Sequence, residues 1–322
     1  MQKKGPFLTP SPSCHDHPVP LTIPPVLARN VVENWSVDGQ RWLSQLPQLL
    51  DELARDWELH LGTPYDLSYH WVTPVTRRDG SPAVLKVGVP SGHLATQAQA
   101  LQIFDGDGAV RLLAYDPDRG ALLMERAEPG DRVAELVPSH DAKATAALIE
   151  VGQRLHRPPA PDCLLPDLRE ESKSFRAHLA RYPGDDPIPR VLVERAAALF
   201  DELCASAPER LVLHGDLHHD NVLRAERAPW LAIDPHGVVG DPGYDCGALL
   251  YNPDPWRREE ELLKLVPARI EQLADGYRQP VDRIVAWGFV MGVLSEVWTA
   301  QGDGTPGSRA LDVATLLYPQ LS

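Results

Sequence analysis

The spacing of apolar residues changes near residue 128, and this change constrains the predicted fold more than any other feature of the sequence. Between residues 57 and 127, short alternating apolar runs predict three strands, a helix and two further strands. Beyond residue 128 the long segments repeat apolar residues at helical spacing, as in residues 140–156 and 282–298. The pattern therefore predicts an α+β fold with two lobes, a small N-terminal lobe built on an antiparallel sheet and a mainly helical C-terminal lobe.

The lobe boundaries follow from the same pattern. Residues 21–127 would form the N-terminal lobe, in which helices over residues 23–32 and 41–57 precede the five-stranded sheet. Residues 128–322 would form the helical lobe. The first twenty residues hold five prolines and no apolar stretch like a signal-peptide core, so we expect them to be a disordered leader.

Composition excludes several classes of protein. A formal net charge of −14 disfavours nucleic acid, which is bound by clustered Lys and Arg. The apolar run over residues 284–294 is shorter than the roughly 17–25 residues of a membrane span and predicts a buried helix. The cysteines Cys14, Cys163, Cys204 and Cys246 form no C-x-x-C pair, which fits a reducing compartment. We expect a cytoplasmic monomer or weak homodimer that binds neither nucleic acid nor membrane.

The stretch LVLHGDLHHDN, residues 211–221, places polar side chains after an apolar run. Asp216 follows a short predicted strand, Asn221 lies five residues later, and Asp234 follows the next strand-like segment. Lys86 ends an apolar run in the small lobe. A carboxylate can orient a substrate hydroxyl and accept its proton, and amide and carboxylate oxygens suit Mg²⁺. This order and spacing match the phosphoryl-transfer site of a protein-kinase-like fold.

Two segments carry a more specific resemblance. HGDLHHDNVL and WLAIDPHGVVGDPGYDCGALLYNP resemble the aminoglycoside phosphotransferase family, in its streptomycin and hydroxyurea phosphotransferase branch. The similarity extends to AVLKV, LLMERA and VLSEVW and covers about residues 21–320. It implies an enzyme that moves the γ-phosphoryl group of ATP, or of GTP, to a hydroxyl of a small molecule. The resemblance implies streptomycin or hydroxyurea as the acceptor. Phosphorylation would inactivate streptomycin and so confer antibiotic resistance.

The resemblance also implies a role for each residue of the constellation. Asp216 would be the catalytic base, and Asn221 and Asp234 would hold Mg²⁺. Lys86 would bind the α- and β-phosphates of the nucleotide. His214 would organise the loop and make no contact with substrate.

The remaining nucleotide contacts are expected at two places. Residues 124–127 resemble the hinge between the lobes, which begins at Met124. The backbone of Glu125 and Ala127 would form hydrogen bonds with the nucleobase there. The loop GTPYDLSY has a single glycine, Gly62, so it is not the glycine-rich loop of protein kinases. Backbone amides and Ser68 would cover the phosphates instead.

Two positions depart from the family pattern. Gln97 falls where the family usually carries a helix glutamate that pairs with the lysine. Its amide would accept a hydrogen bond from Lys86 but lacks the negative charge of a glutamate, so a catalytically impaired nucleotide-binding scaffold is an alternative function. Asp220 stands where the related motif has glycine. Aspartate tolerates left-handed backbone angles, so we expect a modest effect and additional negative charge beside the metal.

The acceptor is expected to be cationic or polyhydroxylated and to lie in a cleft of the helical lobe. A polycationic acceptor requires carboxylates, for which Asp241, Asp245 and Glu296 are candidates. Asp245 could instead anchor the helix that it starts.

The histidines of the motif leave one further alternative. His214, His218 and His219 with Asp216 could form the nitrogen and oxygen ligand set of a metal-dependent hydrolase. Such an enzyme would have no use for Lys86 at the end of its strand.

Overall fold

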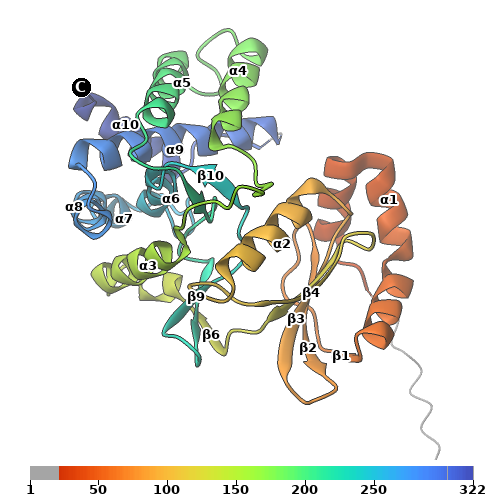
Figure 1. The fold of residues 1–322 in the computed structure, drawn as a ribbon. Coiled ribbons are helices and arrows are strands. Elements are labelled where there is room, and N and C mark those ends of the chain that lie inside the picture. Colours follow the sequence, from red (N-terminus) through yellow and green to blue (C-terminus); the bar gives the residue numbers. More distant parts are fainter. Residues whose placement is uncertain (1–21, 303, 322) are drawn as a thin grey trace, which may run out of the picture.

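The computed structural model describes residues 22–302 and 304–321, so the predicted leader over residues 1–20 lies outside the described residues. An antiparallel sheet in the order β1-β2-β3-β5-β4 lies on one side of the molecule (Figure 1). Its strands are β1 (Leu59–Leu61), β2 (Trp71–Arg77), β3 (Pro82–Val87), β4 (Leu112–Asp116) and β5 (Ala121–Glu125). The helix α2 (Gly92–Phe104) separates β3 from β4, which confirms the predicted order of three strands, a helix and two strands.

The two faces of this sheet are covered by different helices. Because side chains alternate along a strand, Leu85 and Leu123 face one side, where they pack with Leu27 and Leu50 of α1 (Pro25–Asp56). Leu122 faces the other side, in a cluster that also contains α2. The two helices expected over residues 23–32 and 41–57 lie within α1, which consists of two helical segments that meet at a kink at Ser36, where φ is 47° and ψ is −119°.

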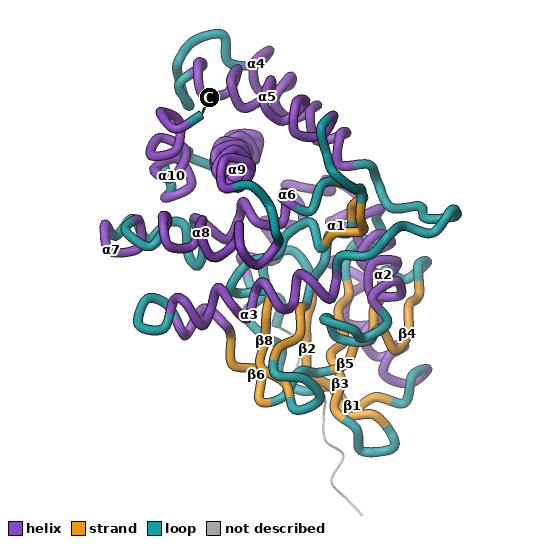
Figure 2. The backbone as a smooth tube through the Cα atoms, turned by 60° about the vertical axis from the view of Figure 1, so that its left-hand side comes forward, coloured by secondary structure: helices purple, strands orange, loops and turns teal. Residues whose placement is uncertain are grey.

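Most of the remaining chain is helical, as predicted (Figure 2). The helices are α3 (Asp141–Leu155), α4 (Ser172–Arg181), α5 (Arg190–Ala205), α6 (Gly243–Gly247), α7 (Glu260–Leu263), α8 (Val266–Tyr277), α9 (Val281–Gln301) and α10 (Arg309–Leu317). Short 3₁₀ turns cover Val133–Leu136, Leu168–Glu171, Ala248–Leu250 and Tyr318–Gln320.

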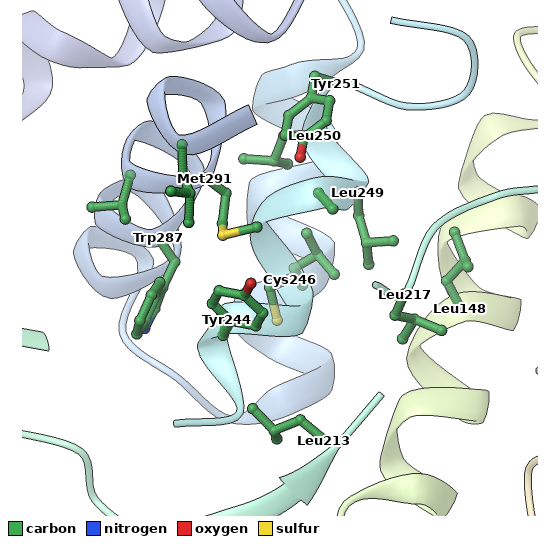
Figure 3. Close-up of a cluster of buried hydrophobic side chains, with 14 of the residues drawn as sticks. Leu148, Leu213, Leu217, Tyr244, Cys246, Leu249, Leu250, Tyr251, Trp287 and Met291 are labelled. Atoms are coloured by element: carbon green, nitrogen blue, oxygen red, sulfur yellow. The ribbon is translucent and has the colours of Figure 1, made fainter. Parts of the chain in front are cut away.

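The helix α9 forms the centre of this helical part. It is long and apolar enough to cross a membrane, but 78% of its apolar window is buried inside the protein. Figure 2 shows α9 along its axis, with α10, α6 and α8 around it. Figure 3 shows Trp287 and Met291 of α9 against Tyr244 of α6, and a Cβ on Gly247 would collide with Met291. The predicted buried helix over residues 284–294 is therefore confirmed, as a core helix.

Two small sheets hold the loops that carry the polar motif. One joins β6 (Pro129–Arg132), β8 (Val222–Ala225) and β9 (Trp230–Ala232), and the other pairs β7 (Leu211–Leu213) with β10 (Val238–Gly240). The residues between β7 and β8 include Asp216 and Asn221, and the residues between β9 and β10 include Asp234. The two loops lie side by side, and Ile233 N donates to Asn221 O over 2.9 Å.

Candidate active site

Lys86, Gln97 and Asp234 come together from three separate elements. Lys86 is 5% exposed, and its ammonium donates to Gln97 Oε1 over 2.8 Å and to Asp234 Oδ1. Gln97, which is 3% exposed on α2, donates from Nε2 to Asp234 Oδ1 over 2.9 Å. Gln97 Nε2 also lies 4.0 Å from Met124 Sδ. The side-chain amide therefore bridges the lysine and the carboxylate beside the end of β5.

Asp234 is held as a carboxylate. Burial alone would raise its pKa, but the charge of Lys86 and the hydrogen bond from Lys86 lower the pKa to about 2. Its backbone has φ of 58°, an angle that few residues other than glycine adopt. Such local strain persists where the surrounding contacts fix the residue, and here Lys86 and Gln97 supply those contacts.

Asp216 lies in the loop after β7 with its side chain 37% exposed. Asn221 Nδ2 donates to its carbonyl oxygen over 3.0 Å and to its Oδ2 over 3.2 Å. His218 Nε2 and His236 Nε2 lie 3.5 and 3.8 Å from the same Oδ2. Burial would raise the pKa of Asp216, but the charge and hydrogen bond of His218 hold it below its usual value. Asp216 is therefore an ionised and accessible carboxylate at neutral pH.

The oxygen atoms around this loop fit a hard cation. Asn221 uses Nδ2 for its contacts with Asp216 and His218, which directs its Oδ1 elsewhere. Lys86 and Gln97 both donate to Oδ1 of Asp234. Its Oδ2 accepts no hydrogen bond from the described residues, which leaves this oxygen available to a cation. An amide oxygen and a carboxylate oxygen are ligands that suit Mg²⁺.

Asp245 holds the backbone of the loop. Its side chain, which is 0% exposed, accepts hydrogen bonds from His214 N over 3.0 Å and from Gly215 N over 2.9 Å. Its Oδ2 also lies 3.0 Å from His156 Nε2, at the end of α3. Gly215 has φ of 84°, and a Cβ there would lie 2.9 Å from Val238 Cγ1, so the loop also requires glycine at this position. The sequence pattern gave no indication of His156.

The three candidate carboxylates of an acceptor cleft are all buried and used inside the protein. Asp241 accepts from Gly243 N over 2.8 Å and pairs with Arg283. Glu296 accepts from Gly307 N over 2.6 Å and from Ser308. The prediction that Asp241, Asp245 and Glu296 bind a cationic acceptor is therefore wrong, since bonds to backbone amides and an arginine occupy them. Asp245 is an anchor, although for the loop more than for the helix that it starts.

The histidines of the motif do not converge. His214 Nδ1 accepts from Asp216 N over 3.2 Å, and its Nε2 lies 2.9 Å from Ile233 O, so both ring nitrogens are engaged. His219 is fully buried and burial holds its pKa well below the usual value. Across residues 22–302 and 304–321 no group of three or more His, Cys, Asp or Glu side chains could hold a metal ion. This geometry does not support the metal-dependent hydrolase.

The other residues predicted to contact the nucleotide lie at the end of β5 and in the loop between β1 and β2. Met124 and Glu125 end β5 and Ala127 follows two residues later; Glu125 N donates to Arg111 O over 2.9 Å. A contact between the Glu125 backbone and the nucleobase would therefore use its carbonyl oxygen. Ser68 is exposed in the loop between β1 and β2, where its carbonyl oxygen accepts from Asn30 of α1 over 3.1 Å.

Asp220 does not need the backbone freedom of glycine. Its φ lies outside the left-handed region, and its Oδ1 is 3.2 Å from Arg132 Nη1. The left-handed angle considered for this position is not used.

Comparison with known proteins gives the family. Residues 62–304 match the model of the aminoglycoside/hydroxyurea antibiotic resistance kinases. The chain is 34% identical over 308 residues to the streptomycin 6-kinase of Streptomyces glaucescens, covering 93% of this chain and 96% of the relative. It is 36% identical over 239 residues to the hydroxyurea phosphotransferase of Kitasatospora aureofaciens, covering 72% of this chain and 68% of the relative.

Solved structures show the same fold at low identity. The choline kinase LicA from Streptococcus pneumoniae matches with a TM-score of 0.56 at 11% identity, over 86% of this chain and 97% of that chain. An aminoglycoside-3'-phosphotransferase of type VIII matches with a TM-score of 0.54 at 18% identity, over 77% of this chain and 98% of that chain. The predicted kinase-like α+β fold is thereby confirmed. The chain belongs to the aminoglycoside/hydroxyurea antibiotic resistance kinase family, and it is a small-molecule phosphotransferase.

Proposed function

We propose that this protein transfers the γ-phosphoryl group of ATP to a hydroxyl of a streptomycin-type aminoglycoside and so inactivates the antibiotic. Two contacts carry the proposal: Lys86 binds Asp234, and Asn221 binds Asp216 in the adjacent loop. The chain is also 34% identical to a streptomycin 6-kinase. Hydroxyurea is the second candidate acceptor, because a hydroxyurea phosphotransferase is 36% identical over 239 residues. GTP carries the same phosphates as ATP and would suit the same contacts.

Asp216 would act on the acceptor. Its carboxylate is ionised at neutral pH and exposed enough to meet a hydroxyl, which it would orient and from which it would accept the proton. Positioned proton transfer of this kind contributes about 10²–10⁴-fold to rate. His218 and Asn221 hold the carboxylate in place through their contacts with Oδ2.

Lys86 would bind the phosphates of the nucleotide, with Gln97 holding its ammonium. Asn221 and Asp234 would hold Mg²⁺ with their side-chain oxygens. Bound Mg²⁺ would offset the negative charge of the nucleotide phosphates. The loop with Ser68 would lie over the phosphates.

The nucleobase would lie along residues 124–127, between lobes formed by residues 21–127 and 128–322. Because the Glu125 amide is already paired, the bonds to the base would come from the carbonyl oxygen of Glu125 and from the backbone of Ala127. We also expect a cytoplasmic monomer or weak homodimer.

The impaired scaffold remains the competing function. It was suggested by Gln97, yet the amide holds Lys86 at 2.8 Å in the way that a glutamate would. This contact favours an active enzyme.

The test is ADP release by the purified protein with Mg²⁺-ATP, measured over streptomycin, other aminoglycosides, hydroxyurea and simple sugars. We expect turnover that depends on streptomycin and that falls by about 10²-fold or more in Asp216→Asn. Calorimetry should show that Asp216→Asn still binds ATP. If ATP binds but no acceptor raises ADP release above that of Asp216→Asn, the antibiotic kinase is excluded and the scaffold is favoured.

A further inference from the structure

Arg227 in the turn between β8 and β9 contacts two distant segments at once. Its Nε and Nη2 donate to Glu125 Oε1 and Oε2 over 2.8 and 2.9 Å, which is a bidentate pair. Its Nη1 donates to Gly106 O over 2.7 Å, and its Nη2 donates also to Ala109 O over 3.0 Å. One guanidinium therefore ties the turn both to the end of β5 and to the segment that joins α2 to β4.

The hairpin that carries Arg227 also carries the two proposed metal ligands. β8 begins directly after Asn221, and β9 ends shortly before Asp234, so the ligands lie at the opposite end of the hairpin from Arg227. Backbone bonds fasten the same hairpin to the small lobe, since Ala232 N donates to Gly108 O over 2.8 Å and Val110 N donates to Ala232 O over 3.0 Å. A shift of residues 106–110 relative to the hairpin would therefore break several bonds together.

Glu125 is held from both sides. Besides Arg227, its Oε2 accepts from Arg111 N over 2.9 Å. The side chains of Arg227 and Glu125 are only 28% and 20% exposed, so solvent screens this pair less than an ordinary surface ion pair. Burial would raise the pKa of Glu125, but the hydrogen bond from Arg227 and the other contacts lower it. The pair is therefore charged at neutral pH.

We propose that Arg227 is a positioning residue for the nucleotide. By fixing Glu125, it sets the place of residues 124–127 relative to the hairpin end that bears Asn221 and Asp234. The nucleobase contacts and the phosphate contacts are thereby held at a set separation before the nucleotide binds, which lowers the cost of ordering them. This inference rests on the proposed function, because it takes residues 124–127 as the nucleobase site.

Lysine cannot reproduce this arrangement. A single ammonium is a point donor, whereas the planar guanidinium reaches one carboxylate and two carbonyl oxygens with fixed geometry. Arg227→Lys should consequently bind ATP nearly as weakly as Arg227→Gln, and Glu125→Gln should weaken binding in the same direction.

The experiment measures the Kd of ATP by calorimetry, at a temperature well below the melting point of each variant. Arg227→Gln should raise the Kd about tenfold, which is a typical effect of losing one charge-assisted pair. The matched control is Arg224→Gln on the same hairpin, where the side chain is 62% exposed and its contact with Asp131 is 4.0 Å long. This control should stay within about twofold of the wild-type protein.

The same titrations in Mg²⁺ and in EDTA separate the possible causes. If Arg227 sets the separation between residues 124–127 and the metal ligands Asn221 and Asp234, Arg227→Gln should weaken ATP binding by a larger factor in Mg²⁺ than in EDTA. An equal loss in both would mean that Arg227 does not act on this separation, and would overturn the inference. An unchanged Kd with a lowered melting temperature would overturn it as well, by showing a purely structural role. If the wild-type protein bound no ATP, the proposed function itself would fail, which is a distinguishable result.

Discussion

Gln97 joins Lys86 to Asp234 through both atoms of its amide. The oxygen accepts from Lys86 Nζ over 2.8 Å, and the nitrogen donates to Asp234 Oδ1 over 2.9 Å. A glutamate at this position could accept from the lysine but could not donate to the aspartate. The departure from the usual glutamate is therefore matched to a contact that only an amide can make.

Gln97→Glu should destabilise the protein in the absence of nucleotide. The new carboxylate would replace a hydrogen bond to Asp234 with a contact between two negative charges in a buried position, at a cost of about 1–3 kcal/mol. We expect a melting temperature lower by several degrees, measured by differential scanning fluorimetry without nucleotide. Gln102→Glu, on an exposed position of α2, is the matched control and should melt close to the wild-type protein. An unchanged or raised melting temperature in Gln97→Glu would show that attraction to Lys86 outweighs the repulsion.

Asp245→Asn should lower kcat much more than it changes the KM for ATP. Asparagine keeps one side-chain oxygen, but its NH₂ group replaces the other oxygen and cannot accept a hydrogen bond. One of the bonds from His214 N and Gly215 N is therefore lost, and the loop that carries Asp216 should shift. Misplacement by about 1 Å can cost about 10²-fold in rate. Steady-state kinetics with varied ATP test this, with Asp275→Asn on the exposed side of α8 as the control. A raised KM for ATP with normal kcat would contradict the anchoring role.

The sequence predicted those features that depend on neighbouring residues. The strands and helices follow from local periodicity, and the order Lys86, Asp216, Asn221 and Asp234 follows from motif spacing. The resemblance to the family indicated Gln97, which the structure places 2.8 Å from Lys86 Nζ.

Contacts between distant residues that belong to no motif could not be predicted in this way. Glu125 and Arg227 are 102 residues apart, and His156 and Asp245 are 89 residues apart. A carboxylate near a site can face a cleft or can bind buried amides, and only the packing decides between them. Asp241 and Glu296 were misassigned for this reason.

Asp220→Gly should leave the enzyme close to normal. The backbone at Asp220 does not use left-handed angles, so glycine removes no strain and adds only flexibility, at about 0.5–1 kcal/mol. The pair with Arg132 is partly exposed, 33% and 56% by side chain, and such pairs contribute about 0–1 kcal/mol. Streptomycin-dependent turnover should stay within about threefold of the wild-type rate. A change beyond tenfold would show that the charge of Asp220 acts on the metal site.

Asp167 should make stability depend on pH in the acid range. The hydrogen bond from Arg169, opposed by burial and reinforced by the charge of Arg210, lowers its pKa from 3.8 to about 2. Because the folded pKa lies below the unfolded one, the unfolded chain binds the proton first as pH falls. The stabilisation is thus complete above about pH 4 and disappears as pH approaches 2.

The difference in pKa corresponds to about 2 kcal/mol at neutral pH, as an upper bound, since the Asp167 side chain is 26% exposed and partly screened. Urea unfolding of the wild-type protein and Asp167→Asn at pH 7, 5 and 3 measures it. The gap in unfolding free energy should be equal at pH 7 and 5 and should shrink to about half at pH 3, where much of the Asp167 carboxylate of the unfolded chain is already protonated. A gap that stays constant down to pH 3 would mean that Asp167 stabilises the fold through its hydrogen-bond geometry, with no contribution from its charge.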